Sequence, residues 1–232
     1  MQTMIGKNRF KRVKMKTKLC IFDLDGTLFN TLPTITHYVN KTITAHNIAP
    51  ITLEECREFV GAGARNLILR TLAHRGISDK DFAEKILSEY LPDYDNDPNY
   101  LTEIYSGVPE LLSELKKRGI AIAVYSNKPD YATKRVVQDF FGDMFSAVLG
   151  ARDGVPLKPS PVGVLELVAT LGFTPDESIF IGDSEIDVQT AKNAGLSSVA
   201  VTYGFRDKEC LLLAGAENLA DHPLRVLDYI NI

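Results

Sequence analysis

Residues 21–28 of the chain read IFDLDGTL, and this stretch decides the fold. An apolar run over residues 19–22 leads into two carboxylates, Asp23 and Asp25, and then into Gly26. Apolar β-branched and aromatic residues ahead of a glycine are typical of a short buried strand that ends in a turn. Because side chains alternate along a strand, the two carboxylates point the same way. Two like charges at such a short distance need a cation or a shared proton to offset their repulsion. The stretch therefore indicates a strand end that holds a metal and performs acid–base or nucleophilic chemistry.

The composition is that of a soluble globular protein. The 232 residues are 45% hydrophobic, and their apolar runs are too short to span a bilayer. This length fits one large domain or a core with a smaller insert. Three cysteines, Cys20, Cys56 and Cys210, lack the paired spacing of a disulfide framework or a zinc site. We therefore expect a cytoplasmic protein with no membrane partner.

The first residues carry a charge opposite to that of the rest of the chain. Residues 1–18 include seven of the 26 basic residues and no acid, although the whole chain has a formal net charge of −4. A basic segment can bind nucleic acid, but this one lacks the apolar core of a secretory signal. We interpret residues 1–18 as a disordered tail or as the product of a start codon placed too early, since Met15 directly precedes the first predicted strand. A nucleic-acid partner is accordingly not expected.

The pattern that follows the first strand divides the chain in two. Helical spacing predicts four helices and then a turn-rich return linker at residues 92–99; the helices span residues 32–47, 53–60, 64–75 and, from an N-cap at Asp79, 80–90. From residue 109 helices and strands alternate, which implies βαβ units and a mostly parallel sheet with helices on both faces. We therefore predict an α/β fold, with a Rossmann-like doubly wound core over residues 19–30 and 104–232. A small α-helical cap domain over residues 31–103 is inserted into it.

Polar residues directly follow several of the predicted strands. Ser126 and Asn127 follow one strand, Asp183 and Asp187 follow another, and Lys158 lies between them in the sequence. Ligands of open α/β sheets bind beyond the carboxyl ends of the strands. Carboxylates with few histidines suit a hard ion such as Mg²⁺, and an ammonium with a hydroxyl suits a phosphate. Together these residues indicate a phosphoryl-transfer site.

The order Asp-x-Asp, Ser-Asn, Lys-Pro and Gly-Asp-x-x-x-Asp resembles the four signatures of the haloacid dehalogenase (HAD) superfamily. The finer pattern is similar to phosphoglycolate phosphatases and their close relatives, in segments that include residues 126–129, 158–161 and 191–195. A helical cap between the first and second signatures is the subclass arrangement that the chain resembles. The second acid, Asp25, favours phosphoryl transfer over dehalogenation, because a halide leaving group needs no proton.

The resemblance implies how the carboxylates and a metal divide the chemistry. Asp23 would be the nucleophile that forms an aspartyl-phosphate, and Asp25 would protonate the leaving group and then accept a proton from water. The resemblance also implies Mg²⁺, held by the Asp23 side chain, the backbone carbonyl of Asp25 and Asp183. These roles are expectations carried over residue by residue.

The remaining residues of the site would position the substrate. Ser126, the Asn127 backbone and Lys158 would hold the phosphoryl oxygens. Asp187 lies one helical turn beyond the metal ligand and would orient either metal-bound water or Lys158. Thr27 would brace the turn that carries the two acids.

Substrate specificity is expected to come from the cap. Residues 59–65 read FVGAGAR and place two glycines ahead of Arg65 at a predicted helix start. Glycines allow a ligand to approach the backbone closely, and arginine suits a carboxylate or a second phosphate. We predict that Arg65 contacts the anionic end of the leaving group.

The sequence leaves several functions open. The leading hypothesis is a Mg²⁺-dependent phosphatase for a small phosphorylated metabolite, such as phosphoglycolate or a sugar phosphate. A β-phosphoglucomutase-like sugar-phosphate mutase and a pyrophosphatase of the same superfamily are the alternatives. A non-catalytic phosphate-binding module is disfavoured because Asp23, Asp25, Lys158 and Asp183 are all present. The sequence decides neither the ester nor whether the protein is a monomer or a homodimer.

Overall fold

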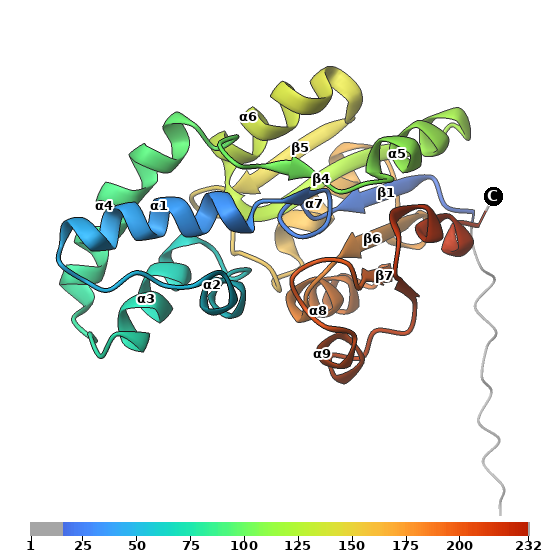
Figure 1. The fold of residues 1–232 in the computed structure, drawn as a ribbon. Coiled ribbons are helices and arrows are strands. Elements are labelled where there is room, and N and C mark those ends of the chain that lie inside the picture. Colours follow the sequence, from blue (N-terminus) through green and yellow to red (C-terminus); the bar gives the residue numbers. More distant parts are fainter. Residues whose placement is uncertain (1–15, 232) are drawn as a thin grey trace, which may run out of the picture.

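The computed structural model describes residues 16–231, which form a six-stranded parallel sheet with helices on both faces and a group of helices beside it (Figure 1). The strand order is β5-β4-β1-β6-β7-β8. These strands are β1 (Leu19–Phe22), β4 (Ala121–Pro129), β5 (Ala147–Ala151), β6 (Ser178–Gly182), β7 (Ser197–Val201) and β8 (Leu219–Ala220). Since β1 pairs with β4 on one side and with β6 on the other, its carboxyl end lies in the interior of the sheet.

Alternation along β1 explains why both faces of the sheet are covered. Cys20 and Phe22 pack with α5 and α6 on one face, whereas Leu19 and Ile21 pack with α7 and α8 on the other. The helices of this part are α5 (Val108–Lys117), α6 (Asp130–Phe141), α7 (Val162–Thr170), α8 (Glu185–Ala194) and α9 (Lys208–Leu213). The predicted α/β fold with a parallel sheet is confirmed.

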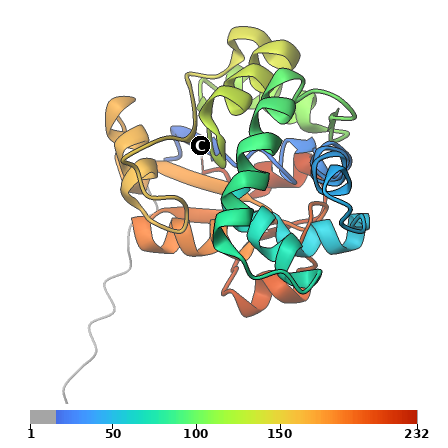
Figure 2. The same cartoon turned by 90° about the vertical axis from the view of Figure 1, so that its left-hand side faces the viewer.

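Four further helices lie between β1 and β4 in the chain and pack against one another. They share a hydrophobic cluster that includes Val39, Ile43, Ile68 and Leu72. Figure 2, seen from their side, shows them in front of the sheet. These helices, which we call the cap helices, are α1 (Leu32–Ala45), α2 (Leu53–Phe59), α3 (Ala64–His74) and α4 (Lys80–Asn96).

A two-stranded antiparallel ribbon connects the cap helices to the sheet. Its strands are β2 (Phe29–Asn30), where the chain leaves, and β3 (Glu103–Ile104), where it returns. Pairing of Phe29 with Ile104 and of Asn30 with Glu103 holds the two crossings side by side. The ribbon lies at the predicted boundaries near residues 30 and 104, and the division into two domains stays a prediction.

Helix α4 is longer than the sequence predicts. The prediction ended it near Tyr90 and placed a linker at residues 92–99, but the helix continues through Pro92 to Asn96. Proline removes one backbone N–H from the helix and usually breaks it. Here Tyr90 and Tyr94 lie one turn apart, are both buried, and stack with ring centroids 5.4 Å apart. Burial of this apolar face explains why α4 continues past the proline.

The other helix and strand boundaries agree with the prediction to within a few residues, with one exception. Strand β4 does not end at Tyr125 but continues to Pro129, with a register shift against β5 between these two residues. The segment that carries Ser126 and Asn127 is therefore an irregular strand end rather than a loop. The sequence analysis also gave no prediction for the ribbon, for α9 or for β8.

The ends of the described chain bear on two further predictions. Residues 1–15 lie outside the described residues, and with them most of the predicted basic tail. The prediction of a disordered tail does not fit Thr17 and Lys18. Their backbone N–H groups donate to the carbonyls of Asn231 and Glu177, each at 2.8 Å. Within residues 16–231, no helix is both long and apolar enough to span a membrane.

Candidate active site

The carboxyl ends of β1, β4 and β6 form the floor of a pocket that the cap helices cover. Asp23 directly follows β1, Asp183 directly follows β6, and Ser126 and Asn127 lie at the irregular end of β4. These four residues line the pocket together with Lys158. Three parallel strands thus bring together side chains that are up to 160 residues apart, as sheets of this class do at their carboxyl ends.

Lys158 lies between two buried carboxylates. Its Nζ is 2.8 Å from Asp23 Oδ1 and 2.7 Å from Asp187 Oδ1, and the lysine side chain is only 2% exposed. Burial alone would lower the pKa of this ammonium, but the charges of Asp187 and Asp23 outweigh it and raise the pKa. Lys158 therefore keeps its positive charge although its side chain is almost fully buried.

Asn127 fixes the backbone of Lys158. The Lys158 N–H donates to Asn127 Oδ1 at 2.8 Å, and Asn127 Nδ2 donates to the Lys158 carbonyl at 3.1 Å. The same amide nitrogen donates to the carbonyl of Gly61 between two cap helices. One side chain at the end of β4 thus sets the position of the buried lysine and also contacts the cap.

Asp187 is held by the start of its own helix. Ser184 is the N-cap of α8, and Asp187 Oδ2 accepts hydrogen bonds from the Ser184 N–H and hydroxyl at 3.1 and 2.6 Å. The other oxygen, Oδ1, accepts from Lys158. Both oxygens therefore already accept hydrogen bonds. The sequence left two roles open for Asp187, orienting metal-bound water or orienting Lys158, and these contacts fit the second.

Asp183 lies against backbone that only glycine permits. Its Oδ2 accepts a hydrogen bond from the Phe205 N–H at 2.7 Å, and Thr27 Oγ1 lies 3.4 Å from Oδ1. A Cβ on Gly26 would overlap the Asp183 carboxylate, and a Cβ on Gly204 would overlap the Gly26 carbonyl. Two close-packed glycines thus leave the space in which this carboxylate is held.

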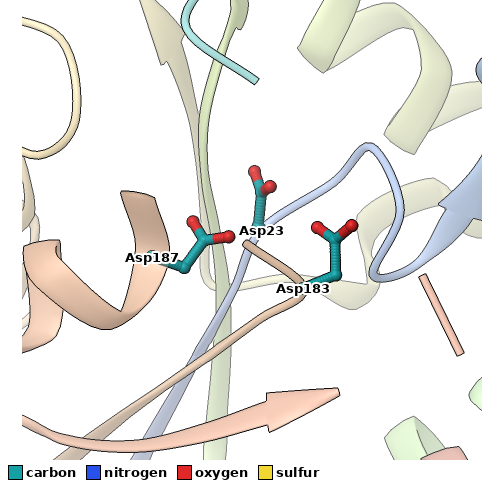
Figure 3. A group of neighbouring side chains, drawn as sticks. All are labelled: Asp23, Asp183 and Asp187. Carbon is teal, nitrogen blue, oxygen red and sulfur yellow. The ribbon is translucent and has the colours of Figure 1, made fainter. Parts of the chain in front are cut away.

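The three buried carboxylates form a cluster suited to a cation (Figure 3). Asp23, Asp183 and Asp187 each place one oxygen within 4.8 Å of the others. Burial, opposed by Lys158, raises the pKa of Asp23 to about 7, and burial with the neighbouring charges of Asp187 and Asp23 raises the pKa of Asp183. Asp23 Oδ1 meets Lys158 outside hydrogen-bonding angles, so this buried oxygen lacks a hydrogen-bond donor among the described residues. An oxygen-ligated divalent cation fits these donors.

Asp25 stands apart from that cluster. Its Oδ1 accepts hydrogen bonds from Thr31 Oγ1 at 2.7 Å and from Lys128 Nζ at 3.0 Å. Lys128 also donates to the hydroxyl of Tyr94 on α4, and its Nζ lies 4.6 Å from the centroid of that ring. The second acid of the first motif is thus linked through one lysine to the cap.

An arginine also connects the two sides of the pocket. Arg206 lines the pocket and pairs with Glu185 at the start of α8 at 3.0 Å. Its two terminal nitrogens donate to the carbonyls of Arg57 and Val60 at the end of α2. With all three nitrogens engaged, this guanidinium joins the loop after β7 to the cap helices.

Comparison with known proteins assigns the family. A family model described as haloacid dehalogenase-like hydrolase matches residues 20–201, which include every strand of the sheet except β8. The chain belongs to this family. The resemblance drawn from the four signatures is therefore confirmed.

Individual relatives of this HAD hydrolase are phosphatases. A phosphoglycolate phosphatase from Rhodospirillum rubrum is 34% identical over 194 residues, which cover 81% of this chain and 80% of the relative. The N-acetylmuramic acid 6-phosphate phosphatase of Pseudomonas aeruginosa is 31% identical over 221 residues, which cover 94% and 96%. A solved structure from Lactobacillus delbrueckii subsp. bulgaricus, described as a candidate phosphoglycolate phosphatase, is 30% identical and superposes with a TM-score of 0.88 over 94% of this chain and 99% of that one. The predicted enzyme class, a phosphatase, is confirmed.

The structure brings most of the predicted site residues of this HAD phosphatase together. Those that line the pocket are Asp23, Asp25, Ser126, Asn127, Lys158 and Asp183. Asp187 and Thr27 lie behind them, in contact with Lys158 and Asp183 respectively. The roles of these residues in binding and catalysis stay predictions.

Arg65 is not brought to the pocket. Its guanidinium pairs with Glu84 of α4 at 2.6 Å on the outer surface, and its side chain is 58% exposed. The preceding residues Gly61, Gly63 and Ala64 do line the pocket. Arg65 is the second residue of α3, and the helix turns its side chain away from the site. The structure thus brings the predicted loop to the pocket but not the Arg65 side chain.

Two cations of the pocket were not among the predicted site residues. Lys128 directly follows Ser126 and Asn127, so the motif itself contained the signal. Arg206 lies beyond the last signature, in the segment after β7, where the sequence offers no strand-end motif to draw attention to it. Contacts made across the pocket, rather than sequence pattern, reveal the position of Arg206.

Gly26→Ala is expected to impair this site beyond its effect on stability. Gly26 has a φ of +85°, so alanine costs about 1–3 kcal/mol of backbone strain and also displaces Asp183. Gly76→Ala is the matched control, because Gly76 has a φ of +76° but nothing in residues 16–231 beyond its own neighbours lies within 4 Å of the position that a Cβ would take there. Urea unfolding should show the strain loss in both variants and a further loss in Gly26→Ala from the clash with Asp183, whereas phosphatase activity should fall at least about tenfold only for Gly26→Ala. Equal activities of the two variants would contradict the role of the close approach.

Proposed function

We propose that this HAD phosphatase requires Mg²⁺ and hydrolyses a small phosphorylated metabolite through an aspartyl-phosphate on Asp23. The observation that carries the proposal is the buried arrangement of Asp23, with Lys158 on one side, Asp183 on the other and Asp25 two residues further along the chain. A nucleophile, a counter-charge, a metal ligand and a proton carrier are the parts that phosphoryl transfer needs.

Asp23 and Asp183 are the side chains that would hold the metal, with the carbonyl of Asp25 as a third donor. The close approach of one oxygen from each carboxylate and the mutual repulsion of the carboxylates support this assignment. When bound, Mg²⁺ would neutralise charge on the phosphoryl oxygens. Asp187 would not be a ligand, since its two oxygens already accept from Lys158 and Ser184.

The reaction would proceed in two steps. In the first, a carboxylate oxygen of Asp23 attacks phosphorus, the ester P–O bond breaks, and Asp25 gives its proton to the departing alkoxide. In the second, a water molecule gives a proton to Asp25 and attacks the same phosphorus. The P–O bond to Asp23 then breaks, which releases inorganic phosphate and restores the enzyme.

The phosphoryl group would be held by the end of β4 and by Lys158. Ser126 Oγ accepts a hydrogen bond from the Lys128 N–H at 3.2 Å, so its own hydrogen is available to a phosphoryl oxygen. Lys158 donates one of its three hydrogens to Asp187 and forms an ion pair with Asp23, so a further hydrogen can point toward the same group. Fixed donors of this kind stabilise the charge of the transition state without rearranging.

The relatives suggest the class of ester. Phosphoglycolate and N-acetylmuramic acid 6-phosphate, named for the two groups of relatives, are both phosphate esters that carry a carboxylate. Phosphoglycolate is the leading candidate, since several of the matched curated phosphatases bear that name. The amino-sugar phosphate is the second candidate, favoured by the 94% and 96% coverage of the two chains. We propose that the cap helices form a separate domain and select between these two esters. We also propose a cytoplasmic location, which the three free cysteines fit.

Release of inorganic phosphate from a panel of phosphorylated metabolites would test this function. The panel includes both candidate esters, pyrophosphate, a hexose phosphate and p-nitrophenyl phosphate, each with Mg²⁺ and with EDTA. We expect turnover of at least one monoester with Mg²⁺ and its loss in EDTA. Undiminished turnover in EDTA would contradict the metal requirement, and isomerisation of the hexose phosphate without phosphate release would indicate a mutase instead.

A further inference from the structure

Three cations line the pocket within the described chain. The proposed reaction accounts for one of them, and contacts with the cap helices account for a second. Lys158 lies between Asp23 and Asp187, at the end of the pocket where the phosphoryl group would bind. Arg206 uses all its nitrogens on Glu185 and on two carbonyls of the cap helices. Lys128 remains, and no step of the proposed reaction uses it.

Lys128 is a buried ammonium with one hydrogen to spare. Its side chain is 2% exposed, and Nζ donates to Asp25 Oδ1 at 3.0 Å and to the Tyr94 hydroxyl. An ammonium has three hydrogens, and these are its only hydrogen-bond acceptors in the described chain. A buried donor without a partner costs free energy, and because Lys128 lines the pocket, a ligand can supply the missing acceptor.

The contact with Asp25 places this ammonium on the leaving-group side of the substrate. In the proposed reaction Asp25 protonates the ester oxygen, so it must lie next to that oxygen. Lys128 Nζ is one hydrogen bond further along from the same carboxylate. A group attached to the carbon next to the ester oxygen would therefore lie within reach of Lys128.

The cap helices contribute no charged side chain to the lining of this end of the pocket, although the charge of Asp95 on α4 lies close enough to interact with Lys128. In the described chain, the side chains that α1, α3 and α4 contribute to the pocket are Ile35, Ala64, Leu67, Tyr90 and Tyr94, none of them charged. Arg65, the cation that the sequence analysis had chosen for the leaving group, pairs with Glu84 outside. The cation that can bind an anionic leaving group thus comes from the sheet and not from the cap.

We infer that Lys128 is the specificity residue that binds a carboxylate on the leaving group. The inference rests on the proposed function and deepens it, because it limits the preferred substrates to esters with a carboxylate close to the ester oxygen. Tyr94 and Asp25 hold the ammonium in place, and the substrate carboxylate takes its third hydrogen in a charge-assisted hydrogen bond.

The test compares two esters that differ at a single group. Phosphoglycolate and 2-hydroxyethyl phosphate share the phosphate and the first carbon, and a carboxylate in one replaces a CH₂OH in the other. Lys128→Met removes the ammonium and keeps an apolar side chain of similar length. Any effect of the variant on Asp25 lowers turnover of both esters alike, so the ratio of their kcat/KM values isolates carboxylate recognition.

We expect wild type to prefer phosphoglycolate and Lys128→Met to reduce that preference by about 10- to 100-fold, mostly through a higher KM for phosphoglycolate. Lys134→Met, which removes an exposed lysine on α6, should leave the ratio unchanged. Tyr94→Phe, which keeps the ammonium and removes one of its partners, should reduce the preference less than Lys128→Met. It is the variant to measure if Lys128→Met does not fold.

Two results would overturn the inference. One is an equal fall in kcat/KM for both esters in Lys128→Met, which would restrict Lys128 to an effect on Asp25. The other is wild-type turnover of p-nitrophenyl phosphate with Mg²⁺ but without any preference for phosphoglycolate over 2-hydroxyethyl phosphate. The proposed function would survive both results, and it would fail separately if wild type hydrolysed no ester at all.

Discussion

Asp23→Asn is expected to lower ester hydrolysis by at least about a thousandfold, because an amide oxygen is a poor nucleophile and the two-step route is lost. The measurement is release of inorganic phosphate with Mg²⁺ at saturating substrate. A covalent phosphoryl group should be detectable in wild type after acid quenching and absent from the variant. Asn is nearly the same size as Asp, so the pocket and its cap contacts should be retained. A variant that keeps more than about a tenth of the activity would contradict Asp23 as the nucleophile.

The same substitution is expected to stabilise the metal-free protein above neutral pH. Burial raises the pKa of Asp23 from 3.8 to about 7. A group whose pKa is higher in the folded protein supports folding below its unfolded pKa, and that support is lost as the pH rises through the folded pKa. In EDTA, the difference in unfolding free energy between Asp23→Asn and wild type should therefore grow in favour of the variant from about pH 4 to about pH 7. A difference that does not change over this window would contradict the raised pKa.

Lys158→Met is expected to cost about 3–5 kcal/mol of unfolding free energy and to abolish detectable hydrolysis. The ammonium neutralises Asp23 and Asp187, and all three side chains are largely buried, so its removal leaves two carboxylates without a counter-charge. Urea unfolding in the presence of EDTA measures the stability term without a contribution from metal binding.

Lys134→Met is the matched control for burial. Lys134 pairs with Asp130 at 2.6 Å, a distance close to those of Lys158, but its side chain is 55% exposed. An exposed ion pair contributes no more than about 1 kcal/mol, so this variant should unfold almost as wild type does. Similar losses in the two variants would show that burial does not control the strength of these pairs.

The strand ends of the sheet could be predicted from the sequence because their signals are local. In residues 19–28 an apolar run followed by two acids and a glycine identifies both the buried strand and the end of it that lines the pocket. The same reasoning placed Ser126, Asn127 and Asp183 at one edge, since parallel strands bring their carboxyl ends together. Helix periodicity predicted most helix boundaries for the same reason, as it depends on neighbouring residues only.

The errors occurred where a contact across the fold decides the outcome. The sequence around Pro92 predicts a break, but stacking of Tyr90 on Tyr94 keeps the helix intact. The direction of Arg65 depends on which face of α3 meets the pocket, and periodicity does not give the rotation of a helix about the site. The side chain of Lys128 is held by hydrogen bonds to Asp25 and Tyr94, which lie far from it in sequence.

The ribbon of β2 and β3 has a consequence for how such enzymes diversify. Because the chain departs at Asn30 and returns at Glu103 in paired positions, the described chain passes between the sheet and the inserted helices at two adjacent crossings. Strand order and register in the sheet are therefore independent of how many residues lie beyond those crossings or how they fold. The residues at the strand ends, Lys128 included, can therefore be conserved while the inserted helices are replaced.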